Sequence, residues 1–256
     1  MARRRLRILL TNDDGILSPG LLALKAKLGE VGEVTVVAPD GQRSGSSHSV
    51  TLGSHLVASE VSHRGERVGV SLSGTPVDCV KYAICEHMPD PPDLVVAGIN
   101  LGANAGVSAF YSGTVAAAME GSFFGIPSVA ISTDLNGGEA VDCLPLAEIA
   151  KGILLRLKDL ARSGQRVVLN VNFPALPPKT FKGLRITRQG LASFRDRFER
   201  RDLPQGGEGL WLAGVPGDHG DSLDLDVNAL RAGYISVTPL RQDLTHDELF
   251  EQFKAL

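Results

Sequence analysis

The chain has 256 residues, 43% of them apolar, so it can bury a substantial core as one large or two small domains. Its 26 basic and 29 acidic side chains leave a net charge of -3, which argues against a general affinity for nucleic acid or membrane surfaces. No apolar stretch approaches the ~20 residues that cross a bilayer. No secretory signal follows the basic start, and the three cysteines lack CxxC spacing. We therefore expect a cytoplasmic protein.

Strand and helix patterns alternate along the first two-thirds of the chain. The predicted strands are the apolar runs Leu6–Thr11, Val34–Ala38, Arg67–Ser73, Asp93–Ala97, Ser128–Ile131 and Val167–Val171. The predicted helices are Gly20–Leu28, Thr75–Ile84, Thr114–Phe124 and Leu144–Ala161. Nearly continuous apolar strands that alternate with helices indicate a mostly parallel sheet covered by helices.

The pattern changes after about Pro174, where Gly, Pro and charged residues become frequent. The strand candidates here are Leu184–Thr187, Leu210–Leu212 and Tyr234–Thr238. Two more helices are predicted, one from a Ser222 cap to Arg231 and a terminal one capped by Thr245. The segment from Ala192 to Gly220 lacks the apolar content of a core. We expect either a hairpin or arm used between subunits, or a mobile surface loop.

Two adjacent aspartates, Asp13 and Asp14, end the first predicted strand within Asn12-Asp13-Asp14-Gly15. Like charges this close repel, and leaving both ionised is costly unless a cation or hydrogen-bond donors compensate. A divalent metal is the simplest compensation, because Mg²⁺ and Mn²⁺ prefer oxygen ligands. An ordinary turn explains the same residues. The aspartates alone leave both interpretations open.

Two further polar segments, 39–49 and 98–106, follow later predicted strands. In an open parallel sheet, ligands bind at the carboxyl ends of strands, near the point where strand order reverses. We therefore expect all three segments to converge on one edge of the sheet. Their carboxylates, hydroxyls and amides suit Mg²⁺, Mn²⁺ or Ca²⁺. They suit Zn²⁺ poorly, because no cluster of His or Cys accompanies them.

A third feature is suited to anions. Tyr111-Ser112-Gly113-Thr114-Val115 lies where a Gly-rich loop enters a predicted helix. A helix N-terminus offers unpaired N–H groups and a partial positive charge, and Ser112 and Thr114 would add hydroxyls. In isolation, an ordinary N-cap is the better interpretation of these residues, because most such helix starts bind nothing. Next to a divalent cation, the phosphate interpretation becomes the better one.

Motifs throughout the chain resemble those of the SurE survival-protein family of metal-dependent nucleotidases. They occur in the family's order at Ile8–Ile16, Val37–Asp40, Arg43–Gly45, Ser73–Val80, Gly98–Asn104, Tyr111–Val115 with Ala118, Glu120 and Gly121, Asn170–Pro174, Thr187–Gly190 and Gly233–Leu240. The resemblance implies an α/β fold: a three-layer α/β/α, Rossmann-like, mostly parallel sheet with a C-terminal extension or hairpin used in oligomerisation. It implies one domain over residues 1–256, with a core of about 1–175 plus 234–240 and an extended appendage of about 185–256.

The resemblance also implies a phosphomonoesterase that hydrolyses nucleoside 5′- and 3′-monophosphates, with some members trimming short polyphosphate. One divalent ion per subunit, Mg²⁺ or Mn²⁺, would be held by Asp13, Asp14, Ser44 and Asn100. The substrate phosphate would be bound by Asn12, Asn104, Ser112, Gly113 and Thr114. The implied partners are the nucleoside monophosphate and further copies of the chain, in a homodimer or homotetramer. Nucleic acid polymers and membranes are not implied.

The predicted mechanism is in-line attack by metal-associated water, with the catalytic Asp13 or Asp14 as its base. The helix start at Ser112–Thr114 would hold the phosphoryl oxygens as charge builds. Attack by an aspartate through an aspartyl-phosphate ranks second, because metal binding reduces carboxylate nucleophilicity. His48 is the histidine candidate for the leaving-group acid. A loop histidine bonded to backbone is the competing interpretation.

Two other classes of protein stay open. A metal-dependent deacylase also places aspartates after its first strand, but such sites need histidines, and Thr11-Asn12 stands before Asp13 here. A non-catalytic nucleotide-binding module is compatible with the fold, although the first turn lacks G-x-G-x-x-G. Phe110 and Tyr111 are candidates for stacking on a nucleobase, with buried packing as the alternative.

Overall fold

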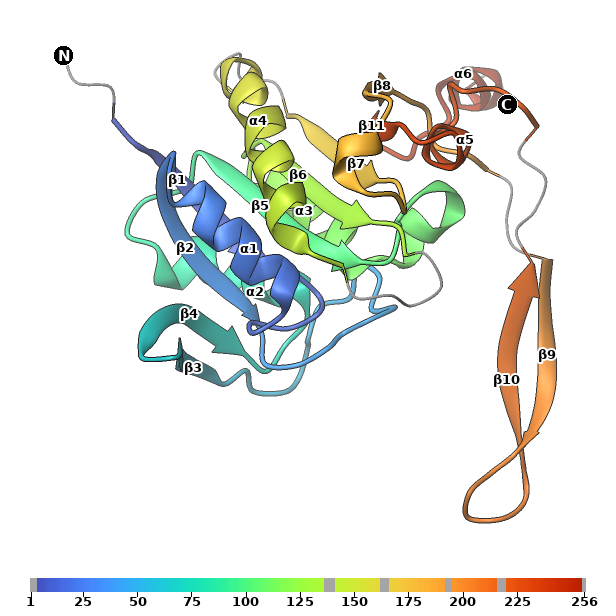
Figure 1. The fold of residues 1–256 in the computed structure, drawn as a ribbon, viewed down its shortest axis with the longest axis horizontal. Helices are drawn as coiled ribbons and strands as arrows, with labels where there is room; N and C mark the ends of the chain where they lie inside the picture. Colours follow the sequence, from blue (N-terminus) through green and yellow to red (C-terminus); the bar gives the residue numbers. More distant parts are fainter. Residues whose placement is uncertain (1–3, 136–140, 162–165, 192–194, 216–219, 255–256) are drawn as a thin grey trace.

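The computed structural model describes residues 4–135, 141–161, 166–191, 195–215 and 220–254. Within these residues, a nine-stranded sheet has the order β3-β4-β2-β1-β5-β6-β7-β11-β8 (Figure 1). Its strands are β1 (Leu6–Thr11), β2 (Gly32–Pro39), β3 (Ala58–His63), β4 (Glu66–Leu72), β5 (Leu94–Leu101), β6 (Ser128–Thr133), β7 (Val168–Phe173), β8 (Leu184–Ile186) and β11 (Ile235–Pro239). Neighbours run parallel except at β3–β4 and β7–β11. The predicted mostly parallel sheet is confirmed.

Helices cover both faces of the sheet and make three layers (Figure 1). They are α1 (Pro19–Leu28), α2 (Pro76–Tyr82), α3 (Gly113–Phe123), α4 (Cys143–Ala161), α5 (Asp226–Arg231) and α6 (Asp247–Phe253). Apolar residues of α1 and α4 share one core cluster with the sheet, and those of α2 and α3 lie in two others. The predicted α/β/α layering is therefore confirmed. Among the described helices, none is both long and apolar enough to span a membrane.

Local sequence determines where α1 and α2 begin. The Ser18 side chain accepts a hydrogen bond from the Leu21 backbone N–H, and a proline follows each cap. At α2 the Thr75 hydroxyl and the Asp78 carboxylate cap each other's backbone N–H groups, a capping box. Thr75 thus begins α2 as predicted, although the α-helix ends at Tyr82 and a π-helical turn, Ala83–His87, follows it.

Strand order reverses at β1. The chain passes from β1 to β2 and β4 on one side, and then returns to β5 on the other side of β1. The parallel register pairs Thr11 with Ala97, so the carboxyl ends of β1 and β5 lie side by side. Open α/β sheets bind ligands at such a crevice.

The C-terminal third divides between the core and an arm. β9 (Arg195–Asp202) and β10 (Glu208–Val215) form an antiparallel hairpin that projects from the body (Figure 1). The hairpin alternative predicted for residues 192–220 is confirmed over 195–215, while 192–194 and 216–219 lie outside the described residues. In contrast, β8 and β11 complete the edge of the main sheet, and α5 packs against β11.

One strand lies outside the predicted elements, and two helices start differently from the predictions. β3 lies outside the predicted elements because it is a polar, largely exposed strand that pairs only with β4 within the described residues. α5 begins at Asp226 rather than after Ser222, whose carbonyl accepts the Leu225 N–H in a preceding turn. His246 caps α6 in place of Thr245, because its ring nitrogen accepts from the Leu249 N–H.

Candidate active site

The turn after β1 carries Asn12, Asp13 and Asp14 to the crevice between β1 and β5. The buried Asn12 amide nitrogen donates to the Gly15 carbonyl at 3.0 Å and to Ser18 Oγ at 2.6 Å. Gly15 has φ +99°, which an L side chain rarely adopts. Asn12 therefore shapes the turn and joins it to the start of α1. Its donors are not available to a phosphate, contrary to its predicted role, and only its carbonyl oxygen is left unpaired within the described residues.

The two aspartates are adjacent, and no basic side chain of the described residues pairs with either of them. Asp13 is 4% exposed, and Thr114 Oγ1 donates to its Oδ1. Asp14 Oδ2 accepts from the Leu101 N–H at 3.3 Å. Neither carboxylate forms an ion pair within the described residues. Two adjacent carboxylates, one buried and one half-buried, fit a divalent cation, which would supply the missing compensation.

Burial raises the pKa of both carboxyls. At Asp13 the Thr114 hydroxyl opposes this effect and the neighbouring Asp14 charge adds to it. At Asp14 the Leu101 N–H opposes burial without overcoming it. Both shifts have the cause expected of carboxylates that lack a positive partner. The alternative of an ordinary solvated turn does not account for them.

The other predicted ligands, Ser44 and Asn100, come from neighbouring loops. The Arg43 N–H donates to the Asp13 carbonyl at 2.7 Å, which places the loop carrying Ser44 against the turn after β1. The Asn100 amide nitrogen donates to the Gly102 carbonyl at 2.7 Å, so its oxygen is the atom that can face a cation. Asn100 directly precedes Leu101, the residue that contacts Asp14. The structure therefore brings all three predicted segments together.

The chemistry of this donor set selects the kind of metal that it can hold. No group of three or more His, Cys, Asp or Glu side chains in the described part of the chain could hold a metal ion. The site offers two carboxylates together with neutral hydroxyl and amide oxygens. This set fits Mg²⁺ or Mn²⁺ and does not fit a structural or catalytic zinc centre.

The N-terminus of α3 lies against Asp13. Ser112 caps the helix by accepting from the Val115 N–H at 3.1 Å. Gly113 permits close packing, because a Cβ there would lie 2.7 Å from Ser46 Oγ and 3.1 Å from the Asp13 Cβ. Ser46 Oγ is itself buried without a hydrogen-bond partner in the described structure. The helix start that sequence assigned to phosphate therefore opens directly beside the carboxylate pair.

Asn104 is fixed by buried polar groups of the sheet. Its backbone N–H donates to Asn172 Oδ1 at 2.8 Å, its side chain donates to Ser132 Oγ at 2.9 Å, and its carbonyl accepts from Asn170 Nδ2 at 2.7 Å. Residue-level reasoning missed these three supporting residues. The signal for them was polar side chains in otherwise apolar strands, at Ser132 of β6 and at alternate positions of β7.

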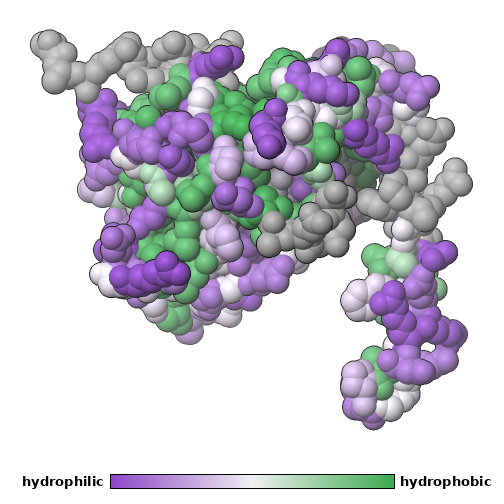
Figure 2. Space-filling model, viewed as in Figure 1, coloured by the Kyte–Doolittle hydropathy of each residue, from purple (hydrophilic) through white to green (hydrophobic). Residues whose placement is uncertain are grey.

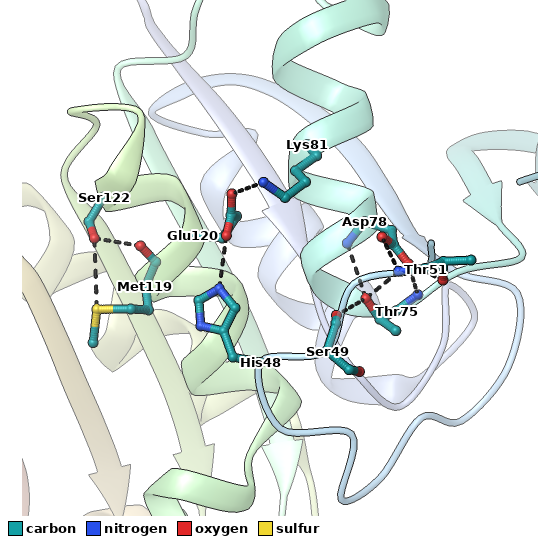
Figure 3. Close-up of polar contacts among 9 residues, drawn as sticks. All are labelled: His48, Ser49, Thr51, Thr75, Asp78, Lys81, Met119, Glu120 and Ser122. Carbon is teal, nitrogen blue, oxygen red and sulfur yellow. Dashed lines mark hydrogen bonds and ion pairs between the residues drawn. The ribbon is translucent and has the colours of Figure 1, made fainter. Parts of the chain in front are cut away.

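His48 binds a buried glutamate on α3 (Figure 3). Its Nε2 lies 2.8 Å from Glu120 Oε2, while Lys81 Nζ lies 2.6 Å from Glu120 Oε1. The expectation of a backbone partner is therefore wrong. Glu120 follows Gly113 by seven residues, roughly 10 Å along the helix at its rise per residue. His48 and Ser112 nevertheless line one cavity, and the role of His48 as the leaving-group acid stays a prediction.

Phe110 and Tyr111 are 54% and 63% exposed, so the expectation of buried packing is wrong. Phe110 and Ser112 line a cavity of about 870 Å³ between α3, the 3₁₀ turn Gly106–Tyr111 and residues 238–244. In the described structure, the lining residues of this cavity include none of the predicted metal ligands. The cavity is therefore separate from the carboxylate pair, although it begins at the same helix start.

Fold and site together define a Rossmann-like α/β protein with a carboxylate pair and a helix N-terminus at the point where strand order reverses. A family model, "Survival protein SurE", matches residues 8–196. The chain belongs to the SurE family, as the sequence motifs indicated.

Its relatives match over almost their full length. Proteins named 5′-nucleotidase SurE are 41% identical in Syntrophomonas wolfei, over 97% of this chain and 94% of the relative, and 43% identical in Synechococcus elongatus, over 98% and 99%. The crystal structure of the SurE protein from Aquifex aeolicus has a TM-score of 0.82 at 36% identity and covers 97% of this chain and 98% of that one.

Proposed function

We propose that this protein is a divalent-metal-dependent nucleotidase that hydrolyses nucleoside 5′-monophosphates to nucleoside and phosphate. The proposal extends to 3′-monophosphates and to short polyphosphate as further substrates. Relatives named 5′-nucleotidase support the reaction class. One observation carries the proposal: buried Asp13 and half-buried Asp14 form no ion pair with a basic side chain of the described residues, and Asp13 lies against the N-terminus of α3.

Asp13, Asp14, Ser44 and Asn100 would hold one Mg²⁺ or Mn²⁺. When bound, the ion would supply positive charge beside the phosphoryl group. The α3 N-terminus, with Asn104, would bind the phosphoryl oxygens as their charge grows in the transition state. Thr114 orients Asp13 through its hydroxyl, so the carboxylate is fixed before substrate arrives.

A carboxylate of the pair would accept the proton of the attacking water. Either Asp13 or Asp14 can take this role, because both carboxylates lie at the carboxyl end of β1 beside the start of α3. Attack by an aspartate on phosphorus ranks second, because a carboxylate that holds a metal is a weaker nucleophile. We assign no residue as the leaving-group acid.

The test is phosphate release from a panel of nucleoside 5′- and 3′-monophosphates. Metal-stripped protein receives Mg²⁺, Mn²⁺ or Zn²⁺ singly, alongside Asp13→Asn and the surface control Asp90→Asn. We expect Mg²⁺ or Mn²⁺ to restore release in the wild type and in the control, and Asp13→Asn to lose about 100-fold or more, as for removal of a catalytic base.

Three outcomes would contradict the proposal. Nucleotide binding without release under any metal would favour the binding module. Zinc-specific activity on an acylated amine would favour the deacylase. Full activity in Asp13→Asn would remove the carboxylate pair from the mechanism.

A further inference from the structure

Another buried carboxylate, Asp226, lies in the C-terminal region and plays no part in the mechanism above. It is fully buried at the first residue of α5. Its Oδ2 accepts from the Gly106 N–H at 2.8 Å, and its Oδ1 accepts from the N–H groups of Gly190 and Val227 at 2.9 and 2.8 Å. The three donors come from three separate segments, so one side chain joins the β5–α3 connection to two parts of the C-terminal region.

Asp226 has no ion-pair partner within the described residues. Burying a carboxylate without a cation is expensive, and backbone N–H groups have to offset that cost. Leu225 is the N-cap of α5, and a carboxylate at the first helical position is favoured by the helix dipole. The bond to Gly106 goes beyond this local role, because it reaches a segment 120 residues away in sequence.

Gly106 is held at both of its backbone polar groups. Its N–H binds Asp226, and its carbonyl accepts from Gln189 Nε2 at 2.9 Å. Its φ of +60° belongs to the left-handed region that favours glycine. Residues from the C-terminal region thus determine the course of the chain at this point.

Gly106 lies between two proposed phosphate contacts. Asn104 comes two residues before it and is pinned by Asn170 and Asn172 of β7. After it, the 3₁₀ turn runs to Tyr111 and delivers Ser112, the cap of α3. A shift of Gly106 would move Ser112 relative to Asn104. Phosphate recognition is sensitive to such shifts, because the binding groups act only from fixed positions.

We propose that Asp226 is a positioning residue for the phosphate pocket, which acts through Gly106 to hold Asn104 and Ser112 in their relative places. The identity of the pocket rests on the function proposed above. The C-terminal region is then part of the active-site support, and phosphate affinity depends on a carboxylate that never touches the substrate.

The test separates phosphate binding from metal binding. Asp226→Asn keeps the side-chain size but presents an amide NH₂ to a backbone N–H. We expect the dissociation constant of inorganic phosphate and the KM for a nucleoside 5′-monophosphate to rise about tenfold, the effect of one lost charge-assisted bond. The Mn²⁺ dissociation constant, measured by calorimetry on metal-stripped protein, should stay within about twofold, because no Asp226 bond reaches the proposed ligands.

Two further variants keep the test decisive. Asp224→Asn changes an exposed carboxylate two residues away and should leave all three constants unchanged. Gln189→Ala removes the bond to the Gly106 carbonyl from a half-buried side chain. It should weaken phosphate binding in the same direction, so it replaces Asp226→Asn if that variant fails to fold.

Unchanged phosphate affinity in folded Asp226→Asn and Gln189→Ala would overturn the inference. An equal loss of phosphate and Mn²⁺ affinity would also overturn it, because that result indicates general damage to the fold. Failure of the proposed function gives a different result: the wild type would release no phosphate from nucleotides. Direct phosphate binding would then still decide the role of Asp226, and a wild type that binds no phosphate would overturn both.

Discussion

Burial alone does not determine how the acidic residues of this protein titrate. Burial raises the pKa of Asp13 and Asp14, which have few donors and no ion-pair partner among the described residues. Burial also acts on Asp78, but the hydroxyls and N–H groups of Thr51 and Thr75 outweigh it and lower the pKa (Figure 3). The same residue type is therefore a structural cap at one site and a candidate cation ligand at another, and the neighbouring donors decide which.

Glu120 provides a prediction at this scale. Burial raises its pKa, but the bonds from His48 and Lys81 outweigh burial, so the net shift is below the ordinary value of 4.5. The unfolded state then binds more protons near that value, so Glu120 stabilises the fold above pH 4.5 and loses that effect as pH falls through its lowered pKa. We expect Glu120→Gln to cost about 1–2 kcal/mol at pH 7, since solvent partly screens its partners.

Thermal unfolding of the wild type and Glu120→Gln between pH 7 and pH 3.5 measures the difference in their stability. This difference should narrow below the ordinary pKa of a glutamate (~4.3–4.5). The exposed Glu66→Gln serves as the control and should match the wild type throughout. A gap between wild type and Glu120→Gln that stays constant down to the lowest pH would contradict the assignment of the stabilisation to the charged form of Glu120.

Among the elements, α1 and β5 approach so closely that only glycine fits between them. A Cβ on Gly20 would lie 2.0 Å from the Ile99 carbonyl oxygen, which is backbone and cannot move aside. Gly152 on α4 has open space around it. Both glycines lower the stability of their helices through poor helix propensity. They differ in packing, because a side chain would clash at Gly20 and would meet open space at Gly152.

We expect Gly20→Ala to destabilise the protein by about 1–3 kcal/mol despite the better helix propensity of alanine, because overpacking forces backbone shifts. Gly152→Ala should stabilise it by about 1 kcal/mol, the propensity difference alone. Urea unfolding midpoints of the two variants measure both effects. Equal midpoints for the two variants would show that the contact between α1 and β5 relaxes freely.

At the scale of the whole molecule, the β9–β10 hairpin stands away from the body with much of its apolar surface exposed (Figure 2). Leu212 lies opposite Phe198, and the period of two places Leu210 on the same face. An isolated two-stranded hairpin is marginally stable in water. We therefore propose that this face is covered by another copy of the chain, in a homodimer or homotetramer.

Leu212→Glu should reduce the assembled mass, because a charge on this face would have to be buried in the contact. Light scattering after size-exclusion chromatography measures the mass. Glu199→Gln, on the opposite face of the hairpin, should leave it unchanged. A wild type that elutes as a monomer at all concentrations tested would contradict the proposed role of the hairpin.

The sequence by itself determined most of the core and located the candidate site. The strands at Leu6–Thr11 and Ser128–Ile131 were readable because strands buried on both faces are continuously apolar. Asp13-Asp14 and the Ser112–Thr114 helix start were readable because both lie within a few residues of an element boundary. β3 could not be predicted from the sequence, because a polar edge strand lacks the alternation of apolar and polar residues that marks a strand.

Only the tertiary structure decided which distant residues act together. The bond between Asp226 and Gly106, the pairing of His48 with Glu120 and the approach of Gly20 to Ile99 each join segments far apart in the chain. Local propensity does not encode such contacts, because they form when the sheet order and the helix layers bring the segments together. Burial raises the pKa of Asp13 and Asp14 in the same way, since desolvation is a property of the packed molecule.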